Sequence, residues 1–140
     1  MVNQNRKGDR RERELVNLLD NHDFAVLRAP ASGSATKREV PDVLAGNGDV
    51  FLALEVKSSG GDPIYIDKKE VKGLQFFAEK FGATPFLGIR FDRMDWYFFR
   101  PEWVYQTEKF YRVKEEDCTD EIPQIGDLEE GVTVRGGPVA

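Results

Sequence analysis

The stretch "VPDVLAGNGDVFLALEVKSS", residues 40–59, predicts two short strands joined by a turn at Asn47-Gly48. Both turn residues tolerate positive φ, which the two-residue turns of hairpins require. Three charged residues, Asp42, Glu55 and Lys57, lie at strand positions of this mostly apolar segment. Burial of an ion costs several kcal/mol unless the ion is paired or binds a ligand. The stretch therefore predicts a hairpin that carries a charged functional site.

The register of this hairpin determines which side chains share a face. A two-residue turn pairs Asp42 with Ala53, so that Asp42 and Glu55 become diagonal neighbours with backbones about 7–8 Å apart. Lys57 follows Glu55 by two residues and points to the same side. The opposite side is purely apolar and is expected to be core: it carries Val50, Leu52, Leu54 and Val56.

A third carboxylate is expected to join this site from an N-terminal helix. Apolar residues recur on one face over residues 8–21, which predicts a helix. Glu12 lies three and seven residues before Leu15 and Leu19, so it belongs to the same inward face. A carboxylate directed at the core needs a partner, and the Asp42–Glu55 cluster would provide one.

The predicted cluster has the chemistry of an oxygen-coordinated metal site. The chain has one Cys and one His, which excludes sites built from several of these residues. Carboxylate oxygens favour Mg²⁺, with Mn²⁺ as a substitute. Such a site suits phosphodiester hydrolysis, in which Lys57 would orient water or offset developing charge. The alternative is a surface ion pair of Lys57 with Asp42 or Glu55, worth about 0–1 kcal/mol, which does not explain the crowding of charges.

The remaining patterns predict an α/β domain with one mixed sheet flanked by helices. A helix over 67–82 has Asp67 and Glu70 at capping positions and Gly82 at its end. The other expected elements are strands over 24–29, 84–91 and 95–100, a polar loop over 30–40, and a short helix near Pro101. Residues 1–113 are expected to form the folded domain. Residues 114–140 are acidic, contain Pro and Gly, and are expected to be a tail or appendage.

The composition limits the classes of function. The length of 140 residues suits one domain, and no segment has the apolar length of a membrane span. A polar N-terminus without a signal-peptide pattern and a single Cys predict a cytoplasmic protein. The net charge of −5 argues mildly against a nucleic-acid partner, but basic residues predominate over 1–38 and acidic ones over 101–140.

With these residues in place, the chain resembles the PD-(D/E)xK nuclease superfamily and, more closely, the archaeal Holliday junction resolvases. The similarity spans about residues 6–100. The matching stretches are "RKGDRRERELVNLL" (6–19), "FAVLRAPASGS" (24–34), "PDVLAGNG" (41–48), "LEVKS" (54–58) and "FGATPFLGIRF" (81–91). The resemblance implies a restriction-endonuclease-like fold for the 1–113 nuclease domain. It also implies a homodimer that cuts four-way DNA junctions symmetrically with Mg²⁺.

The resemblance also assigns individual residues. Metal binding falls to Glu12, Asp42 and Glu55, with the backbone carbonyl of Val56 as a further ligand. Lys57 is the implied catalytic lysine. The hydroxyl of Ser32 matches a loop group that assists cleavage in this family, and Arg13 and Arg28 match basic positions near the DNA path.

Further basic residues are candidates for phosphate contact. The N-terminal cluster opposes the dipole of its own helix, which favours an external partner over a merely solvated helix start. Its members are Arg6, Lys7, Arg10, Arg11 and Arg13. Lys37 and Arg38 lie in the polar loop, where they would contact a DNA backbone.

Three functions stay open at this point. The first is a structure-selective endonuclease for four-way junctions. The second is another nuclease of the same superfamily, for repair or restriction. The third is a non-catalytic DNA-binding module. The dimer interface is not evident, although two segments are apolar on more than one side: Phe76-Phe77 and the strand 95–100, which is expected to be central in the sheet or at an interface.

Overall fold

The computed structural model describes residues 2–30 and 40–131, with side chains from residue 7 onward in the first helix. The elements, in chain order, are α1 (Val2–Asn21), β1 (Ala25–Arg28), β2 (Val43–Gly46), β3 (Phe51–Ser59), β4 (Ile64–Asp67), α2 (Lys68–Phe81), β5 (Thr84–Phe91), β6 (Trp96–Phe99), the 3-10 helix η2 (Pro101–Trp103), β7 (Tyr105–Gln106), β8 (Phe110–Val113), the 3-10 helix η3 (Glu115–Asp117) and α3 (Ile125–Glu129). No helix in the described part of the chain is both long and apolar enough to span a membrane.

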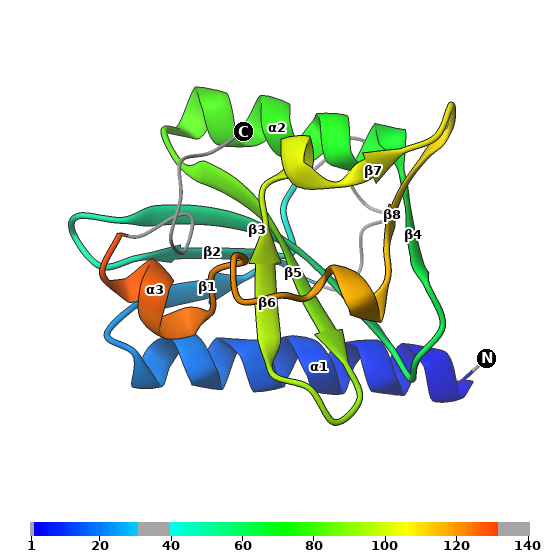
Figure 1. Ribbon diagram of the computed structural model, residues 1–140. Coiled ribbons are helices and arrows are strands. Elements are labelled where there is room, and N and C mark those ends of the chain that lie inside the picture. The colour runs from blue at the N-terminus through cyan, green and yellow to red at the C-terminus, as the bar shows by residue number, and fades with distance from the viewer. Residues whose placement is uncertain (1, 31–39, 132–140) are drawn as a thin grey trace.

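The central sheet has the strand order β1-β2-β3-β5-β6. Its neighbouring strands are antiparallel except for β3 and β5, which are parallel. Helices α1 and α2 lie on opposite sides of this sheet (Figure 1). A second sheet, of order β4-β8-β7, stands beside it. The α/β class with a mixed sheet is as predicted, but β4, β7 and β8 were not, because each is short and borders a turn or a helix.

Each face of β3 packs against a different helix. Leu52, Leu54 and Val56 belong to a core cluster with Leu15 and Leu19 of α1. Ala53 points the other way and belongs to a cluster with the buried face of α2, which consists of Val71, Leu74 and Ala78. This alternation confirms the predicted apolar face. It also places Glu55 and Lys57, which share the parity of Ala53, on the side of α2.

The hairpin register differs from the predicted one. Val43 pairs with Leu54 and Gly46 with Phe51, so the loop comprises residues 47–50 rather than two residues. The backbone N–H of Asn47 donates to the carbonyl of Val50 at 3.0 Å, and Oδ1 of Asn47 accepts hydrogen bonds from the backbone N–H groups of residues 49 and 50, so these contacts close the loop. The slip is two residues, so every side chain keeps its face. However, it places Asp42 directly opposite Glu55 instead of diagonal to it.

Helix α2 forms as predicted, with a difference at its end. Asp67 accepts a hydrogen bond from the backbone N–H of Lys69 at 2.8 Å, and Gly82 closes the helix at φ 91° with a bond to Ala78. Phe77 and Phe81 follow Leu74 at helical spacing, which predicts that they share its face. Phe81 is exposed instead, and its ring stacks on that of Phe77 with centroids 5.4 Å apart.

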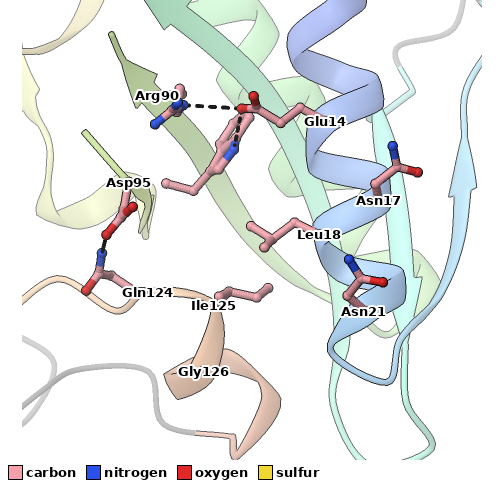
Figure 2. Close-up of a pocket in the computed structure, with 10 residues that line it drawn as sticks. Glu14, Asn17, Leu18, Asn21, Arg90, Asp95, Gln124, Ile125 and Gly126 are labelled. Carbon is pink, nitrogen blue, oxygen red and sulfur yellow. Dashed lines mark hydrogen bonds and ion pairs between the residues drawn. The ribbon is translucent and has the colours of Figure 1, made fainter. Parts of the chain in front are cut away.

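Strand β6 lies at the edge of the sheet, although apolar residues on both faces predicted a central or interface position. Phe98 and Phe99 are both buried, one in each core cluster. The edge is covered by the chain itself, since the N–H of Phe98 donates to the carbonyl of Pro123 at 3.1 Å. Figure 2 shows Gln124 and Ile125 of this covering segment facing Asp95 and α1.

Part of the acidic segment packs against the central sheet and α1. Leu128 of α3 is 1% exposed and belongs to the core cluster on the α1 side. Glu129 lies 2.9 Å from Nδ1 of His22, and its carbonyl accepts a bond from the Asn47 side chain. Residues 132–140 lie outside the described residues.

Candidate active site at the end of strand β3

An open pocket lies where β3 leaves the central sheet. Its walls come from the first half of α1, the residue preceding β2, the second half of β3, β4 and the first turn of α2. The charged groups that line it are Lys7, Arg11, Glu12, Asp42, Glu55, Lys57 and Glu70. The predicted acidic residues and the predicted lysine therefore line one cavity.

Asp42 and Glu55 form the centre of this pocket. Their side chains are hydrogen-bonded to each other, and Oδ2 of Asp42 also accepts a bond from the backbone N–H of Val56 at 2.8 Å. Glu55 is only 9% exposed. The strand register explains the contact, because directly opposed residues of an antiparallel pair have side chains within reach of each other.

Burial and mutual repulsion raise the pKa values of both carboxyls. Burial is the main cause of a pKa of about 6 for Asp42; the bond from Val56 opposes this rise, and the charge of Glu12 adds to it. Burial and then the charges of Asp42 and Glu70 raise the pKa of Glu55 to about 9. Burial and repulsion thus favour the protonated form of this pair. A cation that displaced the proton would remove the repulsion.

Lys57 has a counterion that the sequence did not reveal. Its Nζ lies 3.1 Å from Oε1 of Glu70. Burial alone would lower the pKa of Lys57, but Glu70, Glu55 and Asp42 outweigh burial, so its pKa is raised and the amine stays charged. The sequence assigned Glu70 to a helix cap. The sequence did contain a signal for this pair: Lys57 lies on the face of β3 that packs against α2, so an acidic residue of α2 is its expected counterion.

Glu12 reaches the same pocket but is bound elsewhere. It comes from α1, which covers the opposite face of the sheet, and its Oε1 accepts a bond from Nε of Arg28 at 2.8 Å. Arg28 also pairs with Asp9. Across residues 2–30 and 40–131, no three His, Cys, Asp or Glu side chains lie close enough together to hold one ion. The structure thus joins Asp42 with Glu55 and leaves Glu12 at the pocket wall.

The donor set nevertheless fits a hard divalent cation. Asp42, just before β2, and Glu55 of β3 offer carboxylate oxygens, and Val56 lines the same pocket beside them. The buried pair needs a positive charge, which supports this fit. Glu12 would add an oxygen ligand if its carboxylate left Arg28 and bound the ion.

Of the five predicted DNA-contact residues whose side chains the structure describes, four are engaged in ion pairs. Lys7 and Arg11 both bind Asp92, at 3.3 and 2.6 Å. Arg13 binds Asp9 at 2.9 Å. The pairs with Asp92 tie α1 to the β5–β6 loop, whereas the Arg13–Asp9 pair lies within α1. Arg28 ties β1 to α1 through Asp9 and Glu12, and Arg10 is exposed to solvent. The side chain of Arg6 and the residues Ser32, Lys37 and Arg38 lie outside the described residues.

A second pocket lies between α1, β6 and the segment before α3 (Figure 2). Glu14 at its wall accepts bonds from Nε of Arg90 at 3.2 Å and from Nε1 of Trp96 at 2.9 Å, and Asp95 accepts a bond from Gln124. Arg11 also binds Glu14. This arrangement fixes α1 to the sheet and does not bring carboxylates together, so we place the chemistry at the end of β3.

Comparison with known proteins identifies relatives over most of the chain. The family model described as archaeal Holliday junction resolvase (Hjc) matches residues 3–133. The crossover junction endodeoxyribonuclease Hjc of Sulfolobus acidocaldarius is 42% identical over 132 residues, which is 94% of this chain and 81% of that protein. The Archaeoglobus fulgidus enzyme of the same name is 38% identical over 109 residues, 78% of this chain and 79% of that protein.

The fold agrees with these relatives. The structure of Archaeoglobus fulgidus Hjc, a Holliday junction resolvase, superposes with a TM-score of 0.80 at 33% identity, over 87% of this chain and 99% of that one. The match confirms the predicted α/β, restriction-endonuclease-like class. The chain belongs to the archaeal Holliday junction resolvase family.

Proposed function

We propose that this protein is a crossover-junction endodeoxyribonuclease that resolves four-way DNA junctions by metal-dependent cleavage. The observation that carries the proposal is the buried, hydrogen-bonded pair Asp42–Glu55 with Lys57 beside it in an open pocket. The names of the relatives support the reaction class. DNA as substrate fits a cytoplasmic site of action.

Mg²⁺, with Mn²⁺ as a substitute, is the proposed cofactor, and Asp42, Glu55 and the carbonyl of Val56 would hold it, with Glu12 as a further ligand. When bound, such an ion lowers the pKa of a coordinated water and neutralises phosphate charge. The hydrogen bond from Val56 to Asp42 fixes that carboxylate before any ion arrives. Preorganised ligands of this kind avoid an ordering cost during the reaction.

Lys57 acts on the phosphate side of the site. The charged amine is held toward the pocket by Glu70 and can donate to the scissile phosphate or to the attacking water. Ser32 remains a proposed helper of cleavage. The proposed backbone contacts are made by Arg6, Lys7, Arg10, Arg11, Arg13, Arg28, Lys37 and Arg38. For the paired members of this set, phosphate would have to replace Asp9, Asp92 or Glu12 as the partner.

A cleavage assay tests the function directly. Labelled four-way junction, flap, nicked duplex and linear duplex of matched sequence are incubated with and without Mg²⁺. Paired cuts confined to the junction are expected, and Asp42→Ala should abolish them while junction binding persists. Equal cutting of all substrates supports a different nuclease of the superfamily. No cutting with any divalent ion, together with retained binding, supports a DNA-binding module.

We also propose that the protein acts as a homodimer, because a four-way junction presents two symmetry-related strands to two equivalent sites. The surface that supports pairing is the outer side of α2, where Phe76 is 65% exposed. Val40, Phe76 and Phe77 line a shallow apolar hollow there, flanked by lysines whose stems extend it. In sedimentation, Phe76→Glu should be a monomer, whereas Phe51→Glu, at another exposed aromatic residue, should remain a dimer. In the cleavage assay, the monomeric variant should nick only one strand of the junction.

A further inference from the structure

The second sheet has an aromatic solvent face. Its strands alternate, and the inward side chains are buried in the α2-side core: Ile64, Ile66, Tyr111 and Val113. On the outer face, Tyr65 and Tyr105 are each 56% exposed and Phe110 is 40% exposed. The outer face of a half-buried antiparallel sheet is normally polar. Three large rings in water on one small sheet therefore require an explanation.

The rings and one arginine form a continuous row across the three strands. Arg112 of β8 pairs with Tyr65 of β4 on one side and with Tyr105 of β7 on the other. The guanidinium carbon of Arg112 lies 4.2 Å from the centroid of the Tyr105 ring. The Tyr65 and Phe110 rings meet edge to face with centroids 6.1 Å apart. Neighbouring strands are about 4.8 Å apart, so this row, which we call the aromatic platform, is roughly 10 Å wide.

The aromatic platform is continuous with the active-site pocket. Tyr65 lines that pocket together with Lys57 and Glu70. Arg112 adds positive charge to the row, and its Nε is buried with no hydrogen-bond partner among the described residues. One carboxylate, Asp67, shares this face, but it already accepts a bond as the cap of α2. DNA held at the active site would therefore have rings and a guanidinium beside it.

Stabilisation of the sheet does not account for the whole arrangement. Cross-strand aromatic pairs stabilise a sheet, which explains why Tyr65 contacts Phe110. It does not explain why both tyrosines keep more than half of their surface in water at the two edges of the row. Exposed rings with an arginine plane between them match the way proteins stack unpaired bases without sequence preference.

We propose that the aromatic platform stacks base faces exposed at the centre of the DNA substrate on Tyr65 and Tyr105, next to the scissile strand. The inference rests on the proposed nuclease function and adds a source of structure selectivity. The continuous stacking of a linear duplex offers no free base faces. The centre of a four-way junction interrupts stacking and makes such faces available to the platform.

Binding to modified junctions tests the platform. Four-way junctions with a single abasic site at each nucleotide flanking the crossover are titrated by gel shift in chelator, so that no cleavage occurs. Wild-type protein should bind the intact junction about 5- to 100-fold more tightly than at least one abasic junction. Tyr65→Leu and Tyr105→Leu should lose this difference, whereas Tyr65→Phe, Tyr105→Phe and the control Phe51→Leu should keep it.

Two other results would contradict base stacking on the aromatic platform. Leucine variants that still distinguish intact from abasic junctions show that neither ring stacks a base. Leucine variants that weaken all junctions equally show a structural role. Tyr105 lies at the edge of the sheet farther from the pocket, so Tyr105→Leu gives a reading if Tyr65→Leu does not fold. The cleavage assay with Mg²⁺ stands apart from this result, because the platform can fail while Asp42-dependent junction cutting persists.

Discussion

Nζ of Lys57 on β3 lies 3.1 Å from Oε1 of Glu70 in the first turn of α2. This contact links the predicted catalytic lysine to a helix that begins with its own cap, Asp67. Since Asp67 alone satisfies the cap, Glu70 can turn to the pocket. Glu70 is therefore a positioning residue for Lys57.

Glu70→Gln should slow junction cleavage about tenfold while junction binding stays unchanged. The substitution removes a charge-assisted bond worth about 1.5–3 kcal/mol and leaves the amine less well oriented. It also removes a charge that raises the pKa of Lys57. Single-turnover rates across a pH series measure both effects, with Glu79→Gln on the exposed side of α2 as control. A rate equal to that of the control shows that Lys57 is positioned by other groups.

The buried pair Asp42–Glu55 should make the metal-free protein less stable as pH rises. Their folded-state pKa values of about 6 and about 9 lie above the ordinary 3.8 and 4.5. A carboxyl whose pKa is raised by folding contributes stability that is complete below the unfolded pKa and is lost as pH passes the folded pKa. In chelator, the free energy of unfolding should therefore fall between about pH 4 and pH 9.

Glu55→Gln should flatten that pH dependence. The amide cannot ionise, so at pH 8 the variant should be about 1–3 kcal/mol more stable than wild type in chelator, although it has lost cleavage. Urea unfolding at several pH values provides the measurement, with Glu130→Gln as an exposed control. Mg²⁺ should stabilise wild type at pH 8 and have little effect on the variant. If the free energies of unfolding of wild type and Glu55→Gln change in parallel with pH, ionisation of Glu55 is not the cause of the pH dependence.

The faces of the hairpin could be predicted because side-chain direction has a period of two residues. The actual register differs by two from the predicted one, which leaves Asp42, Glu55 and Lys57 together. A slip of one residue would have separated them. The caps of α2 were also readable, because Asp67 and Gly82 act through local geometry. Local chemistry and periodicity thus recovered the centre of the site.

Contacts between distant elements could not be predicted in the same way. Glu70 meets Lys57 only because α2 lies over the β3 face, and Arg28 meets Glu12 only because β1 runs beside α1. Neither pairing has a spacing rule in the sequence. Strands of two to four residues such as β7 and β8 carry too little periodicity to be distinguished from loops.

The position of Glu12 predicts an accessory role in metal binding. Its carboxylate approaches from the α1 side and must release Arg28 to bind an ion. Glu12→Ala should therefore retain slow cleavage and need about tenfold more Mg²⁺ for half-maximal rate, whereas Asp42→Ala should show no cleavage at any concentration. A Mg²⁺ titration of the cleavage rate measures this difference. An unchanged midpoint in Glu12→Ala would exclude Glu12 as a ligand.

The docking of α3 predicts that part of the acidic segment supports the nuclease core. Leu128 is buried against the cluster that contains Leu19 and Phe86, and Glu129 binds His22. Leu128→Ala should lower the free energy of unfolding by about 2–4 kcal/mol, because a full cavity opens under a helix of five residues. Glu130 lies two residues further along and is exposed, so Glu130→Ala should change the free energy of unfolding by less than about 0.5 kcal/mol. Urea unfolding compares the two variants, and equal midpoints would show that α3 is dispensable for the fold.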